Sequence, residues 1–186
     1  GMPIVWASRL LGRPLKERVA GSDLFVPLCE WAATRGKTLY FLGGLPGGGE
    51  KAAENLKRKF PNIRVMGSYS PPFGFESDAK ENKKIVDLIN QAKPDLLFIA
   101  LGAPKQEKWI AKHIKELDIK VALCIGASVD FVAGTVVRAP QWMRGIGLEW
   151  LYRLLQEPGR LWKRYLVQDM AFLGIFLKRL FKRKKI

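Results

Sequence analysis

The stretch LFIALGAPKQEKW, from Leu97 to Trp109, changes from an apolar run to a polar, helix-like pattern. Its first five residues are a continuous apolar run, which is typical of a strand that is buried on both faces. The run stops at a Gly and a Pro, and polar residues with a helical pattern follow. Three other stretches read as strands separated by helical patterns: TLYFLGG (38–44), NIRVMGSY (62–69) and KVALCIG (120–126). This alternation predicts an α/β protein with a Rossmann-like, mostly parallel sheet and helices on both faces.

Two further helical regions flank this sheet. Ahead of it, two helices are expected around a polar elbow, KERVAGSD (16–23), where Ser22 or Asp23 is in place to cap the second helix. After Gly134 the chain is helical, rich in tryptophan and basic, and Pro158 breaks it into two pieces. We therefore predict an α/β core over residues 1–137 and a basic amphipathic appendage over residues 138–186.

The charge of the chain points to an acidic partner. The 186 residues carry a net charge of +15, and from Leu151 onward ten basic residues face only two acidic ones. Such an excess suits nucleic acid, an anionic membrane or a phosphate-bearing substrate. Cys29 and Cys124 lie in apolar surroundings, which favours reduced core thiols and a cytoplasmic location. No apolar run reaches the roughly 18 to 20 residues of a membrane-spanning helix.

Three loops of small residues follow predicted strands, and all of them are expected at the edge of the sheet where the strands end. They are GGLPGGGE (43–50), GAPKQE (102–107) and GASVDFVAG (126–134). Parallel sheets bind ligands at this edge. The loop with Gly43 and Gly44 has neither the G-x-G-x-x-G spacing nor a Walker lysine, so we favour a tight turn before a helix over direct phosphate contact.

Several polar residues allow two interpretations each. Lys105 and Gln106 either begin a helix with solvated side chains or grip phosphate and sugar hydroxyls. Arg18 is either a surface salt-bridge partner or a diphosphate clamp. Asp130 either caps a helix or binds a hydroxyl and acts as a base. His113 follows helical positions among lysines, so we expect it in solvent.

The sequence contains no D-x-D pair and no cluster of His, Cys and acidic residues, so we predict neither a metal site nor a cofactor. The tail suggests a membrane surface. Phe172 and Phe176 share a helical face with three leucines, while Lys178, Arg179 and Lys182 lie largely opposite and Arg183 follows in KRKK (182–185). This is the pattern of a helix in a bilayer interface. A helix packed on the core is the alternative, and the segregated aliphatic face disfavours nucleic acid as a partner.

Six motifs together resemble the WecG/TagA/CpsF family, glycosyltransferase family 26. They are GMPIVWASRLLG, ERVAGSDL, LGAPKQEKW, VDFVAG, RAP and EWLYRLLQEPGRLWKRY, in the order of the family, from Gly1 to about Tyr165. The resemblance implies transfer of an N-acetylmannosamine-type sugar from a UDP donor to a polyprenyl-diphosphate-linked sugar, in the synthesis of teichoic acid or another bacterial surface polysaccharide. It also implies inversion at the anomeric carbon, no metal or other cofactor, and a peripheral location on the cytoplasmic face of the plasma membrane.

The resemblance also implies roles for single residues. Gln106 matches the active-site glutamine of the family, and Arg18 matches an arginine that contacts the donor or its departing diphosphate. Arg153, Arg160 and Arg164 fall in the basic appendage, which contacts membrane or substrate phosphates. Gly43, Gly44, Lys105 and Asp130 complete the expected substrate-binding set.

One departure from the family concerns activity. The family base is an aspartate immediately before the glycine that stands here as Gly1, so we expect this chain to transfer sugar weakly or not at all. The alternative function is a non-catalytic module that binds membrane or lipid diphosphate. The sequence leaves open whether the subunits form a homo-oligomer.

Overall fold

The structure is a computed structural model, and it describes residues 2–156, 158–163, 167 and 170–183. Its elements follow the chain in this order: α1 (Met2–Leu10), α2 (Gly21–Thr34), β1 (Thr38–Gly43), α3 (Gly48–Lys59), β2 (Arg64–Tyr69), η1 (Phe75–Ser77), α4 (Ala79–Ala92), β3 (Leu96–Ala100), α5 (Lys105–His113), η2 (Ile114–Glu116), β4 (Val121–Cys124), α6 (Ser128–Ala133), α7 (Gln141–Gly145), α8 (Glu149–Gln156), α9 (Pro158–Lys163) and α10 (Met170–Arg183).

The four described strands form one parallel sheet in the order β2-β1-β3-β4. The strands β1, β2 and β4 each lie within a predicted stretch, and β3 begins one residue before the fourth, so the predicted parallel sheet is confirmed. The chain leaves β1 toward β2 and then returns to the other side of β1 for β3 and β4. The topological switch point is therefore between β1 and β3, and ligands of open parallel sheets bind beyond the strand ends at such a point.

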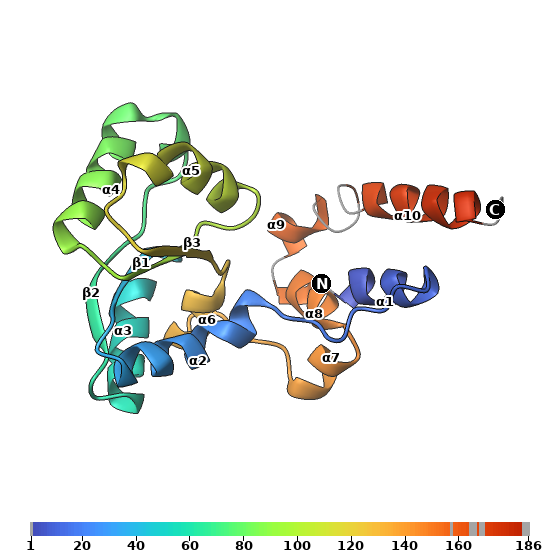
Figure 1. Ribbon diagram of the computed structural model, residues 1–186, viewed down its shortest axis with the longest axis horizontal. Helices are drawn as coiled ribbons and strands as arrows, with labels where there is room; N and C mark the ends of the chain where they lie inside the picture. Colours follow the sequence, from blue (N-terminus) through green and yellow to red (C-terminus); the bar gives the residue numbers. More distant parts are fainter. Residues whose placement is uncertain (1, 157, 164–166, 168–169, 184–186) are drawn as a thin grey trace. The chain divides into compact units, whose positions relative to one another are not determined.

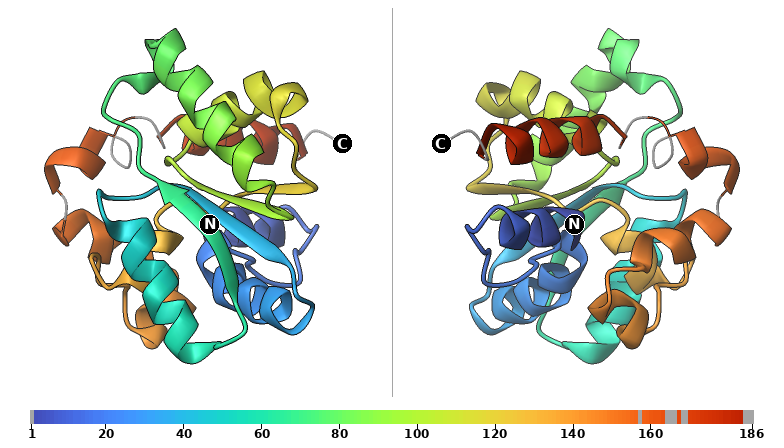
Figure 2. Two further views of the ribbon diagram at one scale, coloured as in Figure 1. Left: turned by 90° about the vertical axis from the view of Figure 1, so that its left-hand side faces the viewer. Right: turned by 90° about the vertical axis from the view of Figure 1, so that its right-hand side faces the viewer.

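Helices cover both faces of the sheet, as predicted (Figures 1 and 2). On one face α2, α3 and α6 enclose a core that includes Phe25, Phe41 and Phe98. On the other face α4 and α5 pack over Leu42, Leu97 and further apolar residues. Because alternate residues of a strand point to opposite faces, β1 and β3 supply side chains to both cores.

Three phenylalanine rings pack together in the first core, between α2 and the sheet. The rings of Phe25 and Phe98 meet edge to face at 4.9 Å, and Phe25 and Phe41 meet in the same way at 5.6 Å. All three side chains are fully buried, as is Cys29 one turn along α2. Burial raises the pKa of the Cys29 thiol to about 12. Cys29 and Cys124 are both free thiols, as the sequence predicts.

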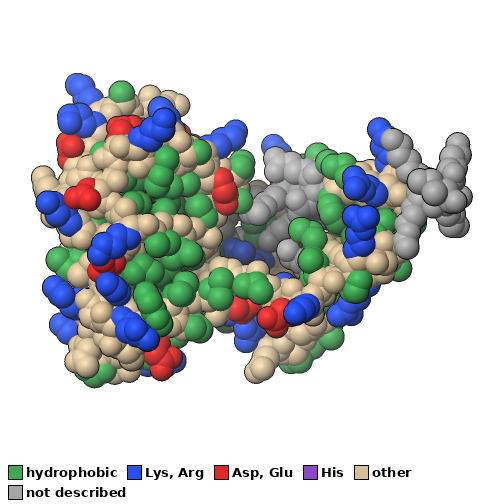
Figure 3. Space-filling view, viewed as in Figure 1, with side chains coloured by type: hydrophobic (Ala, Val, Ile, Leu, Met, Phe, Trp, Pro, Cys, Tyr) green, Lys and Arg blue, Asp and Glu red, His purple; other side chains and the backbone are tan. Residues whose placement is uncertain are grey.

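The chain divides into two compact units. The first, which we call the sheet unit, is Val19–Val137, and the second, the basic unit, combines Gly1–Arg18 with Arg138–Ile186. Sixteen Lys and Arg residues of the sheet unit face thirteen Asp and Glu residues, and side chains of both signs lie near one another on its surface (Figure 3). In the basic unit sixteen Lys and Arg residues face four Asp and Glu residues, so its net charge is +12.

The basic unit is helical where it is described. Gly147, which has φ +82, joins α7 to α8, and a Cβ on it would lie 2.7 Å from that of Met2, so α1 packs closely on this turn. Pro158 begins α9 after α8 has ended at Gln156, which agrees with the predicted break. In the described part of the chain, no helix combines the length and the apolar character needed to cross a membrane.

One prediction about helix caps is wrong. The N-cap residue of α2 is Ala20, and no side chain caps the helix there. The helix begins at Gly21, so Ser22 and Asp23 lie inside its first turn rather than ahead of it. The reason is close packing, since a Cβ on Gly21 would lie 3.0 Å from the Cα of Ile125, just beyond β4. Only glycine allows the start of α2 to approach β4 this closely.

Candidate active site at the carboxyl edge of the sheet

The glycine loop after β1 is a tight turn that is bound to β3. Gly43 has φ +96, and a Cβ on it would lie 2.7 Å from the carbonyl carbon of Ala100. Gly44 has φ +83, and its backbone N–H donates to the Ala100 carbonyl oxygen at 3.1 Å. The Ser70 hydroxyl, beyond β2, lies 3.2 Å from the carbonyl oxygens of Gly43 and Leu45. These contacts hold the loop at the switch point between β1 and β3.

Asp130 holds the other side of this loop. It lies in the first turn of α6, its exposed fraction is 7%, and its Oδ1 accepts the backbone N–H of Leu45 at 2.8 Å. Cβ atoms on Gly44 and Gly48 would both lie 3.1 Å from this Oδ1, so two glycines make room for the carboxylate. The loop therefore wraps around a protein carboxylate, which supports the tight-turn interpretation over an open phosphate cradle.

Gln106 links the loops that follow β3 and β4. It lies in the first turn of α5 and is 5% exposed. Its Oε1 accepts the backbone N–H of Gly126 at 3.2 Å, and its Nε2 donates to Glu107 Oε1 at 2.8 Å. Its side-chain oxygen and nitrogen are thus both engaged, so the glutamine fixes the carboxyl edge where α5 begins.

Lys105, the residue before Gln106, points its side chain to the loop between β2 and α4. Its ammonium forms an ion pair with Glu76 and lies 5.0 Å from the centre of the fully exposed Phe73 ring. The hydrogen bond from Lys105 lowers the pKa of the Glu76 carboxyl. The lysine is therefore a partly exposed cation that already has an acidic partner, and a phosphate would have to compete with Glu76 for it.

A buried polar network behind Gln106 was not foreseen from the sequence. Asn82 on α4 donates through Nδ2 to the carbonyl oxygens of Phe75 and Asp78, at 2.8 and 2.7 Å. Its Oδ1 accepts the Trp109 Nε1–H at 2.8 Å. This network fixes α5 against α4 and the loop that precedes it. The only sequence signal was a polar residue at a helix position flanked by the apolar stripe of α4.

The prediction that His113 is in solvent is wrong. The side chain is 8% exposed, stacks against Trp109 at 5.0 Å between ring centres, and lies 3.0 Å from Glu116 Oε1 through Nδ1. Trp109 and His113 are four residues apart on α5, so they share the face that packs on the sheet. The flanking lysines indicated solvent, but the i, i+4 spacing from a buried tryptophan was the better guide.

Arg18 lies in the basic unit, close to Glu149 and Arg138. Its NH1 atom is 3.4 Å from Glu149 Oε2, and Arg138 Nε is 3.5 Å from Glu149 Oε1. The exposed fractions of the three side chains are 19% for Arg18, 18% for Glu149 and 20% for Arg138. A salt bridge to Arg18 is thus present, but it is a partly buried one, and neither Glu149 nor Arg138 was among the predicted site residues.

The remaining predicted residues of the basic unit differ in how far the structure describes them. Arg153 is half-buried on α8, one turn after Glu149. Phe172, Lys178 and Arg179 are exposed on α10, where Phe176 is half-buried. The following predicted residues lie outside the described residues or have side chains that are not described: Arg160, Arg164, Lys182 and Arg183.

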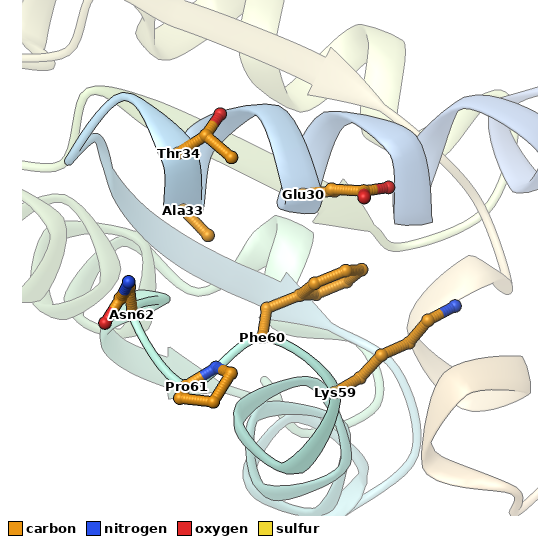
Figure 4. Close-up of a pocket in the computed structure, with 7 residues that line it drawn as sticks. All are labelled: Glu30, Ala33, Thr34, Lys59, Phe60, Pro61 and Asn62. Atoms are coloured by element: carbon orange, nitrogen blue, oxygen red, sulfur yellow. The ribbon is translucent and has the colours of Figure 1, made fainter.

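The hollow of about 200 Å³ in Figure 4 lies away from the carboxyl edge. It is formed where α2 and α3 end, next to the starts of β1 and β2. Helix C-termini disfavour anions, so this hollow does not suit a phosphate-bearing ligand. It is lined by Glu30, Ala33, Thr34, Lys59, Phe60, Pro61 and Asn62. Among the described residues, no three His, Cys, Asp or Glu side chains are grouped as a metal site.

Comparison with known proteins identifies the family. The model of the glycosyl transferase WecG/TagA/CpsF family matches residues 1–186. A relative from Bacillus spizizenii, an N-acetylglucosaminyldiphosphoundecaprenol N-acetyl-beta-D-mannosaminyltransferase, is 38% identical over 166 residues. Relatives with the same name are 34% identical in Bacillus subtilis and 32% identical in Staphylococcus aureus.

These similarities cover most of this chain but only part of each relative. The Bacillus matches include 89% of this chain and 62% of the relatives, and the Staphylococcus match includes 100% and 68%. The chain therefore spans slightly less than two thirds of the length of the Bacillus proteins.

Proposed function

Because the chain belongs to the WecG/TagA/CpsF glycosyltransferase family, we propose that it acts in the transfer of an N-acetylmannosamine-type sugar from UDP to a polyprenyl-diphosphate-linked sugar. The names of the relatives describe transfer of N-acetylmannosamine to an N-acetylglucosamine that is linked to undecaprenyl diphosphate. The product would enter teichoic acid or a related bacterial surface polymer.

The arrangement of loops at the carboxyl edge of the sheet is the main support for this proposal. Loops of small residues after β1, β3 and β4 meet there, and Asp130 and Gln106 hold them in place. The helices α3, α5 and α6 all begin at this edge, so their N-terminal dipoles favour an anionic ligand beside the switch point. We place the UDP-sugar at this edge.

An inverting transfer needs a base for the acceptor hydroxyl and cations for the departing diphosphate. The acceptor hydroxyl loses its proton to a base and bonds to the anomeric carbon, while the bond from that carbon to UDP breaks and its electron pair leaves with UDP. Arginines stabilise the departing diphosphate, and Arg18 has this role in the proposal. Asp130 positions the glycine loop instead of acting as the base, because its Oδ1 accepts the Leu45 N–H.

We further propose that α10 rests on an anionic membrane from the cytoplasmic side. Its exposed residues include Met170, Leu173, Ile175 and Leu177, at 40% to 66% exposure, together with Lys178 and Arg179. Apolar side chains enter the interface of a bilayer, and basic side chains pair with its anionic headgroups. This arrangement would bring the enzyme to its lipid-linked acceptor.

Release of UDP from UDP-N-acetylmannosamine, with lipid-linked N-acetylglucosamine diphosphate as acceptor, tests the transfer. The assay compares this chain with a chimera in which the upstream part of the Bacillus spizizenii relative precedes residue 1. We expect turnover by the chimera, and the prediction that the chain alone is weakly active is tested in the same assay. A chimera that folds, binds UDP and releases none would contradict the proposed reaction, provided that the intact relative turns over.

Co-sedimentation with vesicles of phosphatidylglycerol tests the membrane contact. The substitutions Lys178→Glu and Arg179→Glu together should reduce binding at least tenfold, because each basic residue near an anionic surface contributes about 1 kcal/mol. The same double reversal at Lys57 and Arg58, which are exposed on α3 in the sheet unit, is the matched control. Equal loss in both variants would show that net charge alone, and not α10, binds the membrane.

A further inference from the structure

Two phenylalanines of the loop between β2 and α4 lie two residues apart in opposite environments. Phe75 is 5% exposed and belongs to the core under α4 and α5, whereas Phe73 is fully exposed. Gly74 between them has φ +84, a backbone conformation that glycine adopts without strain. Single exposed apolar residues are common on protein surfaces, so exposure alone assigns no role to Phe73. The case for a role comes from where the loop holds its ring.

The loop is anchored both before and after this ring. Before it, the Ser70 hydroxyl donates to the carbonyl oxygens of Gly43 and Leu45, at 3.2 Å each. After it, the carbonyl oxygen of Phe75 accepts a hydrogen bond from Asn82 Nδ2 at 2.8 Å. The exposed ring therefore stands on a fixed stretch of backbone. A ligand that stacks on such a ring binds without the entropy loss of ordering a loop.

These anchors lead the loop past the switch point of the sheet. Ser70 contacts the glycine loop that follows β1, and Glu76 forms an ion pair with Lys105, the first residue of α5 after β3. The loop thus contacts the chain on both sides of the switch point between β1 and β3. Phe73 lies between Ser70 and Glu76 in the sequence. Its ring is therefore presented beside the place where an open parallel sheet binds its ligand.

Lys105 fixes the orientation of the Phe73 ring. Its ammonium lies 5.0 Å from the ring centre, within the range of a cation–π interaction, and the ion pair with Glu76 holds the ammonium there. Since the phenyl side chain is fully exposed, the ring face opposite the ammonium is open to a second planar group. Lys105 thus has a use that requires no phosphate, in keeping with the acidic partner that it already has.

We propose that Phe73 stacks on the uracil ring of the UDP donor, and that Lys105 and Glu76 are positioning residues for the phenyl ring. This inference rests on the proposed function, which supplies UDP at this edge. A nucleobase is planar and offers a π-face, which is what an exposed aromatic ring binds best. The N-acetylmannosamine ring carries an axial substituent at C2, so it is a less flat partner than uracil.

Stacking on the base predicts a loss that depends on the base. Phe73→Ala should weaken UDP binding about five- to a hundredfold, the range for one base on an aromatic side chain. Inorganic diphosphate has no base, so its affinity should change less than about twofold. Phe73→Tyr keeps the ring and should bind UDP within about threefold of wild type. Both variants should fold, because the side chain is fully exposed.

Isothermal titration calorimetry measures these affinities with UDP, inorganic diphosphate and UDP-N-acetylmannosamine. Phe60→Ala is the matched control, because the Lys59 ammonium lies 5.3 Å from the Phe60 ring centre in the same unit. Phe60 is placed where α3 ends, before β2 begins, so it is remote from the carboxyl edge. This control should alter UDP affinity less than about twofold. Circular dichroism at the assay temperature checks that every variant is folded.

The outcomes separate the inference from the function on which it rests. Weaker UDP binding by Phe73→Ala, with inorganic diphosphate unchanged and Phe73→Tyr close to wild type, would support stacking on the base. Unchanged UDP affinity in Phe73→Ala would overturn it, as would equal losses for UDP and inorganic diphosphate. A loss seen with UDP-N-acetylmannosamine but not with UDP would assign the ring to the sugar and also overturn it. If wild type does not bind UDP, the inference fails for this chain. In each case, UDP release by the chimera decides the proposed function independently.

Discussion

The sheet unit and the basic unit carry the same number of Lys and Arg residues but differ in how these charges are balanced. Acidic residues nearly neutralise the sheet unit, whereas in the basic unit the cations outnumber the acidic residues four to one. Uncompensated charge on a folded protein costs stability through self-repulsion, so its concentration in one unit indicates a role in binding anions. In the proposed function, the sheet unit is the scaffold of the site and the basic unit attracts phosphates and anionic lipid.

Burial differs between the units in the same direction. Most of the buried apolar side chains lie in the sheet unit, and the described part of the basic unit contributes Val5, Ala7, Ala139 and Leu161. A unit with few buried side chains has less hydrophobic stabilisation. We therefore expect core substitutions in the sheet unit to have the largest effects on the free energy of unfolding.

Phe98→Ala should cause the largest loss. Phe98 is fully buried and touches the rings of Phe25 and Phe41, so truncation should lower the free energy of unfolding by about 3 to 5 kcal/mol. Urea denaturation followed by circular dichroism measures the change. Phe73→Ala, at a fully exposed phenylalanine of the same unit, should cost less than about 0.5 kcal/mol. Similar losses in the two variants would show that this core does not hold the sheet unit together.

Gly43→Ala should have the next largest effect. The new Cβ would meet the backbone of Ala100 at 2.7 Å, and its φ of +96 is strained for alanine, so we expect a loss of about 2 to 4 kcal/mol. Gly47→Ala is the matched control, because Gly47 also has a positive φ of +74 but has open space around it. This control should cost only about 1 kcal/mol of strain. If the two losses were equal, the close approach of β1 to β3 would not be the constraint.

Trp109→Phe should have a smaller effect on the same unit. The substitution removes the Nε1–H donor and leaves Asn82 Oδ1 without that bond in a buried position, at a cost of about 1 to 3 kcal/mol. Trp31→Phe, at an exposed tryptophan of α2, should be nearly neutral in the same denaturation experiment. A neutral Trp109→Phe would mean that the buried network does not stabilise α5.

The smallest of these effects depends on pH. Asp95 lies before β3 and accepts from Lys120 and from the Thr38 backbone N–H, and these bonds hold its pKa far below the usual range. The lowered pKa stabilises the fold above the pKa of the unfolded state, about 4, and this stabilisation is lost as the pH falls further. Asp95→Asn should flatten the decline of the melting temperature between pH 5 and pH 3. If the melting temperature of the variant declined as steeply as that of the wild type, other carboxylates would cause the loss of stability at low pH.

The parts of the fold that the sequence predicts are those set by neighbouring residues. Apolar runs and helical spacing located the four strands to within two residues at either end, and Pro158 marked a break between helices. The edge where Gln106 and Asp130 lie followed from the rule that loops after parallel strands share one edge. Local patterns decide such features because they recur every two residues in strands and every three or four in helices.

The partners of the site residues could not be predicted in this way. Asp130 accepts from Leu45, 85 residues earlier, and Arg18 meets Glu149, 131 residues later. Such pairs depend on tertiary packing, which the pattern of one sequence does not encode. His113 was misplaced for a related reason, because the lysines beside it outweighed its spacing from Trp109.

Hydrogen–deuterium exchange with and without UDP tests the division of roles between the units most directly. We predict that UDP slows exchange both in the loops around Gly44 and Gln106 and in the segments around Arg18 and Glu149. The first change would place the ligand at the carboxyl edge, and the second would assign its diphosphate to the basic unit. Protection confined to the sheet unit would contradict the role proposed for Arg18, and protection in neither unit would contradict UDP binding by this chain.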